Sequence, residues 1–209
     1  MNNLFLIFLW RMEMGLLNAL GDKFKKKSLF ADGIEYMKHD KYGKALKCFD
    51  KALKIDSNDV RSWVNRGLTL ENLNRHEEGL ESFDKALKLD PKYIEAWYNK
   101  GLILGNHKMY KEALKHHDKA LEIDPEYSKA WFGKGVVLTN LGKHEEGLES
   151  FDKALKLDPK DITVWFIKAI TLKKIGKYHE ALNCFDKALE LDPNLEAAKK
   201  AKEELLSPM

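Results

Sequence analysis

The chain has 209 residues, of which 33% are charged and 44% are hydrophobic, a composition typical of a soluble helical protein. Its 36 basic and 33 acidic side chains leave a net charge of only +3. This balance argues against a dedicated nucleic-acid-binding protein, since such proteins carry a clear basic excess on one face.

Residues 1–25 show no repeating pattern and contain an unbroken apolar run from Leu4 to Trp10. The run is far shorter than the ~20 residues that span a bilayer, and the basic region that opens a signal peptide is missing. Three interpretations remain open. The segment is a helix that covers the edge of the first repeat, a membrane anchor or export signal within residues 1–20, or sequence upstream of a true start at Met12 or Met14.

From residue 26 onward the sequence repeats with a period of 34 residues, marked by Trp63, Trp97, Trp131 and Trp165. The segment Phe83–Leu87 and the pair Asp90-Pro91 recur in the same step. A fixed period of this size indicates a stack of identical structural units. Residues 26–195 are therefore expected to form one elongated domain of five units: 26–59, 60–93, 94–127, 128–161 and 162–195.

Each unit is predicted to be a helical hairpin. In the unit 60–93, apolar or small residues recur every three or four positions in two halves, which is the spacing of amphipathic helices. A short polar break separates the halves, and later units place Gly142 and Gly176 there, where a helix often ends with positive φ. Asp90-Pro91 ends the second helix, because the residue before proline is pushed out of the α region.

Two fixed positions of the unit hold only glycine or alanine. On the first helix they are Gly33, Gly67, Gly101, Gly135 and Ala169, and on the second Ala45, Gly79, Ala113, Gly147 and Ala181. Glycine inside a helix costs roughly 0.5–1 kcal/mol relative to alanine, so its recurrence predicts a close helix crossing. We interpret Gly67, Gly101 and Gly135, and the tryptophans one turn earlier, as repeat-packing residues.

Residues 196–209 keep helical spacing at Ala198, Ala201 and Leu205, which predicts a C-terminal capping helix. Cys48 and Cys184 occupy the same place in the first and fifth units. Because repeats contact only their neighbours, these two thiols cannot pair within one molecule. A reducing, cytoplasmic location follows, with membrane association through residues 1–20 as the alternative.

The sequence contains no recognised catalytic pattern: no Gly-x-Ser-x-Gly, no phosphate loop and no Gly-x-Gly-x-x-Gly. His116 and His117 are adjacent, so they point in different directions on a helix and do not easily share an ion. His117 replaces a core phenylalanine, and we expect it to be partly buried and hydrogen-bonded. We predict no enzymatic activity, no metal, no cofactor and no small-molecule substrate.

The repeating residues resemble the tetratricopeptide repeat (TPR) family, whose 34-residue unit reads Trp-x-x-Leu-Gly-x-x-Tyr, then Ala, Phe, Ala and Pro. Trp97, Gly101, Leu104, Ala113, Ala120 and Pro125 fall into this pattern. The leucine before glycine is replaced throughout, by Arg66, Lys100, Lys134 and Lys168. The resemblance covers residues 26–195 and implies an all-α, right-handed superhelix (solenoid) of five hairpins, whose first helices line a concave groove.

By this resemblance, the groove-facing positions lie one and five residues after the tryptophan and near the end of the first helix. The first row reads Phe30, Val64, Tyr98, Phe132 and Phe166; the second reads Ile34, Leu68, Leu102, Val136 and Ile170. The candidate binding residues are Asn65, Asn72, Tyr98, Asn99, Asn106, Phe132, Asn140 and Phe166. Asparagine both donates and accepts, so a ladder of it can bind a peptide backbone, above apolar side chains that hold an amphipathic or extended segment. The alternative is that the apolar rows pack between repeats and the asparagines are helix caps.

The leading function is a non-enzymatic protein–protein interaction scaffold that binds an unidentified peptide or partner helix in the groove. The run Leu4–Trp10 is itself a segment that such a groove accepts, so self-association is a variant of this function. A membrane-tethered assembly factor anchored by residues 1–20 is a second class. An RNA-binding helical repeat is a third, based on the basic row at Arg66, but aspartates repeat in the same step and oppose its charge.

Overall fold

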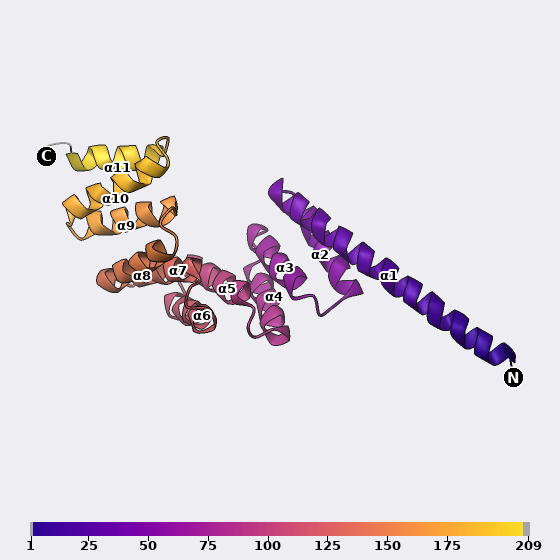
Figure 1. Ribbon diagram of the computed structural model, residues 1–209. Coiled ribbons are helices and arrows are strands. Elements are labelled where there is room, and N and C mark those ends of the chain that lie inside the picture. The colour runs from indigo at the N-terminus through magenta and orange to yellow at the C-terminus, as the bar shows by residue number, and fades with distance from the viewer. Residues whose placement is uncertain (1, 207–209) are drawn as a thin grey trace. The chain divides into compact units, whose positions relative to one another are not determined.

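The structure is a computed structural model that describes the backbone of residues 2–206 and the side chains of residues 14, 15 and 18–206 (Figure 1). Within this range it consists of eleven helices without a strand, which confirms the predicted all-α class. The apolar run Leu4–Trp10 lies outside the residues whose side chains are described. Among the described residues, no helix is both long and apolar enough to cross a membrane.

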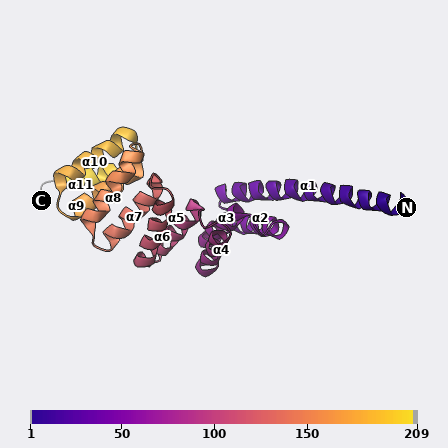
Figure 2. The same ribbon diagram turned by 60° about the horizontal axis from the view of Figure 1, so that its bottom comes forward.

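The chain divides into two compact units, of which the N-terminal unit ends at Ala96. Its helices are α1 (Asn2–Lys38), α2 (Tyr42–Ile55), α3 (Val60–Asn72) and α4 (His76–Leu89). The helices pack as two hairpins, α1 with α2 and α3 with α4, and α2 also contacts α3. With 37 residues, α1 is far longer than α2 and continues beyond it toward the N-terminus (Figures 1 and 2).

The C-terminal unit begins at Trp97, within α5 (Ile94–Asn106). Its remaining helices are α6 (Tyr110–Ile123), α7 (Ser128–Asn140), α8 (His144–Leu157), α9 (Ile162–Lys174), α10 (Tyr178–Leu191) and α11 (Glu196–Leu206). Here α7 pairs with α8 and α9 with α10, while α6 contacts α7 and α8 contacts α9. The predicted hairpins are therefore present in both units.

The helices of a hairpin approach most closely at the small residues that the sequence pattern singled out. A Cβ added to Gly67 would lie 2.8 Å from the Phe83 ring and 3.1 Å from the Gly79 carbonyl oxygen. A Cβ on Gly135 would lie 2.5 Å from the Phe151 ring. The ring at each crossing belongs to the second helix, and the four phenylalanines at this place are fully buried: Phe49, Phe83, Phe151 and Phe185.

The tryptophans of the repeats are partly buried, and three of them connect a first helix to the turn before it: Trp63, Trp131 and Trp165. Trp63 Nε1 donates to the carbonyl oxygen of Ser57 at 2.8 Å, and Trp131 Nε1 donates to that of Pro125 at 2.8 Å. Lys153 Nζ lies 4.2 Å from the centre of the Trp131 ring, a cation–π distance. These indoles therefore link a helix to the turn before it, whereas the phenylalanines fill the buried helix crossings.

A residue with positive φ, in the left-handed region, follows the first helix of each described hairpin. Gly142 and Gly176 have φ of +79° and +80°, as their position predicted. The same turns elsewhere use residues that carry a Cβ, at Asp40, Asn74 and Lys108. In the α7–α8 turn the Lys143 N–H donates to the Leu138 carbonyl at 3.0 Å, which satisfies a carbonyl at the helix end.

An aspartate follows the second helix of every hairpin and shapes the next turn. The N–H of Lys92 donates to Asp90 Oδ1 at 2.9 Å, and the N–H of Asn58 donates to Asp56 Oδ1 at 3.0 Å. Asp56 precedes Ser57 instead of proline. The carboxylate that accepts from the backbone two residues later is therefore the common element of these turns.

Helix α11 closes the C-terminal unit. Its Ala198 and Ala201 are buried in one apolar cluster with Leu172 and Phe185. This packing confirms the predicted C-terminal capping helix, because α11 covers apolar surface of the last hairpin.

Candidate functional site

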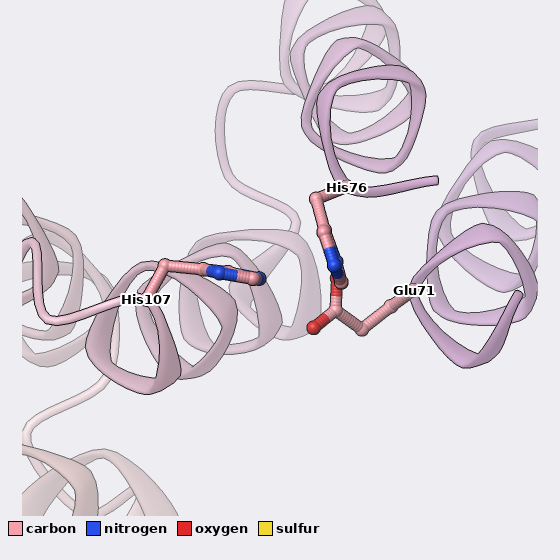
Figure 3. Close-up of side chains that lie close together, drawn as sticks. All are labelled: Glu71, His76 and His107. Carbon is pink, nitrogen blue, oxygen red and sulfur yellow. The ribbon is translucent and has the colours of Figure 1, made fainter. Parts of the chain in front are cut away.

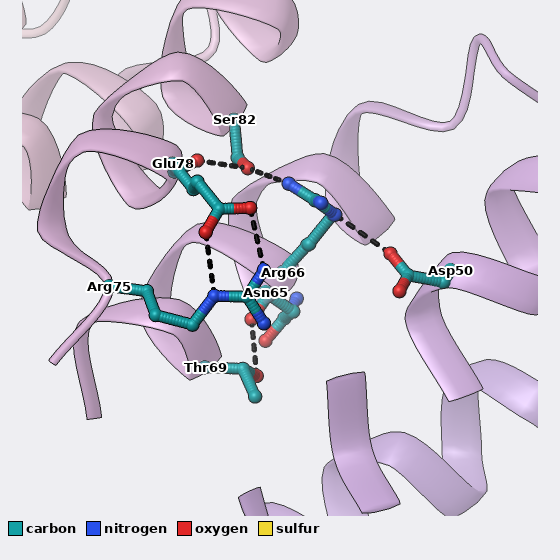
Figure 4. Close-up of polar contacts among 7 residues, drawn as sticks. All are labelled: Asp50, Asn65, Arg66, Thr69, Arg75, Glu78 and Ser82. Atoms are coloured by element: carbon teal, nitrogen blue, oxygen red, sulfur yellow. Dashed lines mark hydrogen bonds and ion pairs between the residues drawn. The ribbon is translucent and has the colours of Figure 1, made fainter. Parts of the chain in front are cut away.

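In the N-terminal unit the candidate asparagines bond within their own helix. Asn65 Nδ2 donates to the Arg61 carbonyl at 2.8 Å, and Asn72 Nδ2 donates to the Leu68 carbonyl at 2.9 Å. Thr69 Oγ1 adds a similar bond to the Asn65 carbonyl at 2.7 Å (Figure 4). One amide hydrogen of each asparagine is therefore used locally.

The basic row that suggested a nucleic-acid backbone is tied into ion pairs. Arg66 Nε donates to Asp50 Oδ1 at 2.8 Å, and Arg66 Nη1 donates to Ser82 Oγ at 2.6 Å (Figure 4). The same register, 16 residues back to the preceding second helix, pairs Lys134 with Asp118 and Lys168 with Asp152. These cations join successive hairpins, so they are not a row of unpaired charges for phosphates.

Polar contacts also brace the α3–α4 turn. His76 Nδ1 lies 2.7 Å from Glu71 Oε2, from the start of α4 to the end of α3 (Figure 3). Arg75 forms a bidentate pair with Glu78, with both distances 2.6 Å (Figure 4). Exposed pairs of this kind contribute little stability and fix local geometry.

The C-terminal unit contains a cavity of about 300 Å³ that is lined mainly by the first helices α5, α7 and α9, which we call the α5–α7–α9 cavity. Its apolar wall consists of Leu102, Phe132, Val136, Val137 and Ile167. Its polar lining comes from Asn106, Tyr110, His117, Asn140 and Thr163. The cavity thus combines apolar surface with amide, hydroxyl and imidazole groups.

Three of the candidate binding residues meet at this cavity: Asn106, Phe132 and Asn140. Asn106 and Asn140 are exposed and are the last residues of α5 and α7. Asn140 Nδ2 donates to the Val136 carbonyl at 2.9 Å, as the asparagines of the N-terminal unit do within their helices. Asn140 therefore uses one of its amide N–H groups within α7.

The other candidates of the C-terminal unit lie away from the cavity lining. The Tyr98 ring meets the Tyr127 ring edge-on at 5.6 Å, and burial raises the pKa of the Tyr98 phenol. The Phe166 ring packs 5.9 Å from the Phe185 ring, and Asn99 is partly buried. In the N-terminal unit, Val64 of the first groove-facing row is only 4% exposed, so it belongs to the core and does not face a groove.

His117 departs from its prediction. We expected a partly buried, hydrogen-bonded side chain; it is 0% exposed, and among the described residues neither ring nitrogen has a partner. The reason is its place at the helix crossing, where Gly101 and Gly133 close over the ring. Burial, with a smaller effect of His116, lowers the pKa of His117 to about 4, so the ring is neutral at pH 7.

Two glycines that line the cavity, Gly105 and Gly133, are not predicted by the repeat pattern. The repeat pattern points to positions that hold glycine or alanine in every unit, whereas glycine stands at the positions of Gly105 and Gly133 in one unit each. An alignment of the five repeat units, position by position, identifies both glycines, because the other units carry a side chain at these positions.

Comparisons with known proteins agree with this architecture. Family models described as tetratricopeptide repeat match residues 28–59, 60–93, 94–127, 128–161 and 162–195. No curated protein matched the chain.

Several solved structures are similar in fold. MamA from Desulfovibrio magneticus RS-1, from its residue 41 to its end, is 26% identical over 82% of this chain and 97% of that one, with a TM-score of 0.69. Pseudomonas aeruginosa PilF is 20% identical over 88% of both chains, with a TM-score of 0.77. YrrB, described as a TPR protein with an unusual peptide-binding site, is 24% identical over 84% of this chain and 90% of its own, with a TM-score of 0.64. These likenesses show that the chain shares the fold of the three proteins.

Proposed function

This chain belongs to the tetratricopeptide repeat family, and we propose that it is a non-enzymatic scaffold that binds a peptide or partner helix on the first helices of its repeats. The observation that carries the proposal is the α5–α7–α9 cavity, whose apolar wall lies beside two exposed asparagines. A peptide site needs both parts, since apolar side chains enter pockets while polar groups hold the peptide backbone.

The asparagines supply the backbone contacts in this proposal. Asn106 and Asn140 occupy the same place in consecutive repeats, each at the end of a first helix. A side-chain amide has two N–H donors and an acceptor oxygen. Asn140 therefore keeps hydrogen-bonding capacity after one N–H is given to the Val136 carbonyl.

Peptide display against the full-length chain tests the proposal. Peptides selected from a random library are titrated against the wild type and against the double variant Asn106→Ala/Asn140→Ala. Two net hydrogen bonds of about 0.5–1.5 kcal/mol each predict a Kd between about five- and 150-fold weaker in the double variant. Asn183→Ala is the matched control, because Asn183 is exposed on α10 and does not line the cavity. An unchanged Kd in the double variant would contradict the proposal.

A second candidate function is contact with a membrane surface through α1. Leu20 and Phe24 are 51% and 73% exposed on this helix, and Lys23, Lys25 and Lys27 stand beside them. Exposed apolar side chains among lysines suit the surface of an anionic bilayer. Sedimentation with phosphatidylserine-containing vesicles tests this function. Leu20→Asp/Phe24→Asp should abolish binding, and equal binding by this variant would rule the contact out.

A further inference from the structure

The N-terminal unit contains a pocket of about 430 Å³ between α1 and the start of α3, which we call the α1–α3 pocket. Pockets that hold small ligands measure about 300–1,000 Å³. Leu20, Phe24 and Phe30 form its apolar wall, and the rest of its lining consists of four basic side chains and one acidic one. An occupant of this pocket must therefore suit both an apolar wall and an excess of positive charge.

Part of the wall belongs to a stretch of helix that the later repeats lack. The first helix of the second repeat begins at Val60, which corresponds to Lys26 in the first unit, whereas α1 begins at Asn2 and continues beyond α2 (Figure 2). Residues 22–25 are therefore helical where the second repeat has the turn 56–59. The α1–α3 pocket is thus a feature of the first unit and not of the repeated groove.

Apolar and basic side chains alternate on one face of this stretch. Leu20, Lys23, Phe24 and Lys27 follow one another in steps of three or four residues, which places them on the same side of a helix. Leu20 is 51% exposed and Phe24 is 73% exposed, more than any other large hydrophobic side chain that the structure describes. Most of the Phe24 ring is therefore accessible to an occupant.

The one carboxylate of the lining, Asp59, is engaged within the protein. It accepts from Ser62 Oγ at 2.9 Å and lies 3.8 Å from Lys26 Nζ. Its side chain is only 9% exposed. Lys26 is engaged as well, since its Nζ donates to Asp56 Oδ2 at 2.7 Å. Asp59 therefore opposes the binding of an anion only weakly, and Lys26 links α1 to the turn before α3.

The remaining three cations of the lining are Lys23, Lys27 and Arg61. Among the described residues none of the three forms an ion pair. The Arg61 guanidinium lies 5.0 Å from the centre of the Phe30 ring, a cation–π distance that holds it at the wall. Arginine and lysine both bind phosphate oxygens. Three such cations beside an apolar wall suit an anion that is joined to an apolar chain.

We propose that the α1–α3 pocket binds the phosphate of one anionic phospholipid at a membrane surface. The phosphate pairs with Lys27 and Arg61, and the acyl chains begin on Leu20 and Phe24. The inference rests on the second candidate function, contact of α1 with a membrane surface, and adds a defined headgroup site to it. The sequence of the same helix also contains the apolar run Leu4–Trp10, which favours a lipid over an acidic peptide as the occupant.

A monomeric short-chain lipid isolates the pocket from the membrane. Dihexanoyl phosphatidylserine, kept below its micelle concentration, is titrated into the isotope-labelled full-length protein, and nuclear magnetic resonance follows the amides of Lys27, Phe30 and Arg61. The pocket predicts saturable shifts at these residues. Dihexanoyl phosphatidylcholine has the same acyl chains and no net charge, so it should bind about fivefold more weakly or less tightly still. Equal binding of the two lipids, or no shift at these amides, would overturn the inference.

The double variant Lys27→Gln/Arg61→Gln removes two cations of the pocket. A loss of about fivefold for each cation predicts that it binds dihexanoyl phosphatidylserine about 25-fold more weakly. Lys25→Gln/Lys51→Gln is the matched control, because it removes the same charge from exposed positions on α1 and α2 outside the lining. The control should change the Kd by less than about twofold, since salt screens exposed charges that do not touch the ligand. An equal loss in both variants would show a general attraction of charge and no pocket.

Two further probes test the identity of the occupant. Glycerophosphoserine carries the headgroup without acyl chains, and a tetrapeptide of two aspartates, phenylalanine and leucine carries negative charge beside apolar side chains. Both should bind more weakly than dihexanoyl phosphatidylserine. If glycerophosphoserine binds as tightly, the pocket takes a small phosphate ester and not a lipid. If the tetrapeptide binds as tightly, the pocket takes an acidic partner protein, and the inference is likewise overturned.

Sedimentation with phosphatidylserine-containing vesicles separates this inference from the membrane contact on which it rests. Vesicle binding that needs Leu20 and Phe24, but is weakened no more by Lys27→Gln/Arg61→Gln than by the control, overturns the pocket and leaves the membrane contact standing. Saturable binding of the monomeric lipid at Lys27 and Arg61, by a protein that does not sediment with vesicles, supports the pocket and counts against the membrane contact.

Discussion

His117→Phe is expected to stabilise the protein. The substitution removes two buried ring nitrogens that have no partner among the described residues. Leaving a buried polar group unsatisfied costs about 1–3 kcal/mol. The crossing has room for the phenyl ring, because a Cβ on Gly101 would lie 2.8 Å from the His117 ring and a Cβ on Gly67 would lie 2.8 Å from the Phe83 ring. We therefore expect His117→Phe to gain about 1–3 kcal/mol at pH 7.5.

The gain should grow as the pH falls. The pKa of His117 is about 4 in the folded protein and 6.5 for an ordinary histidine. Between these values the unfolded chain binds a proton that the folded protein does not, so the wild type loses stability as the solution becomes more acidic. The loss amounts to about 2 kcal/mol at pH 5, since one pKa unit corresponds to about 1.4 kcal/mol. Phenylalanine does not titrate, so the His117→Phe variant does not lose this stability as the pH falls.

Thermal unfolding of the full-length chain at pH 7.5 and pH 5 measures both effects. For a chain of this length, 1 kcal/mol shifts Tm by about 2–4 °C. His179→Phe serves as the control, because His179 is exposed and its replacement should leave Tm nearly unchanged. A Tm of His117→Phe at or below that of the wild type at pH 7.5 would refute the argument from unpaired nitrogens. A difference that fails to widen at pH 5 would refute the depressed pKa.

Two backbone positions give further predictions, each measured as a shift of the urea unfolding midpoint. Lys108→Gly should stabilise the protein by about 0.5–1 kcal/mol, because Lys108 has φ +62° and glycine adopts this region freely; a lower midpoint would contradict this. Gly67→Ala should cost about 1–3 kcal/mol, since a Cβ would press on the Phe83 ring at 2.8 Å and the Gly79 carbonyl at 3.1 Å. Gly43→Ala is its control, because a Cβ at that helical position meets nothing within 4 Å, and equal effects of the two would refute the close crossing.

The hairpins, the turns and the close crossings were predictable from the sequence because each depends on local or periodic chemistry. The position of Gly142 predicted a residue with positive φ at the end of a helix, and Gly67 predicted a helix crossing without room for a Cβ. Such features depend on residues a few positions apart, or on one hairpin that the repeat copies. The family pattern carried the same information in its fixed spacing.

The candidate site was only partly predictable, because a repeat position specifies the face of a helix and not the depth of the space beside it. Val64 and Phe132 occupy the same repeat position, yet Val64 is core and Phe132 lines a cavity. The difference arises where side chains of several helices meet, since the lining of this cavity comes from α5, α6, α7 and α9 together. The sequence by itself determined that His117 replaces a core phenylalanine. Only the tertiary structure decided that its nitrogens lie unpaired against Gly101 and Gly133, because hydrogen-bond satisfaction depends on which atoms of neighbouring helices come within reach.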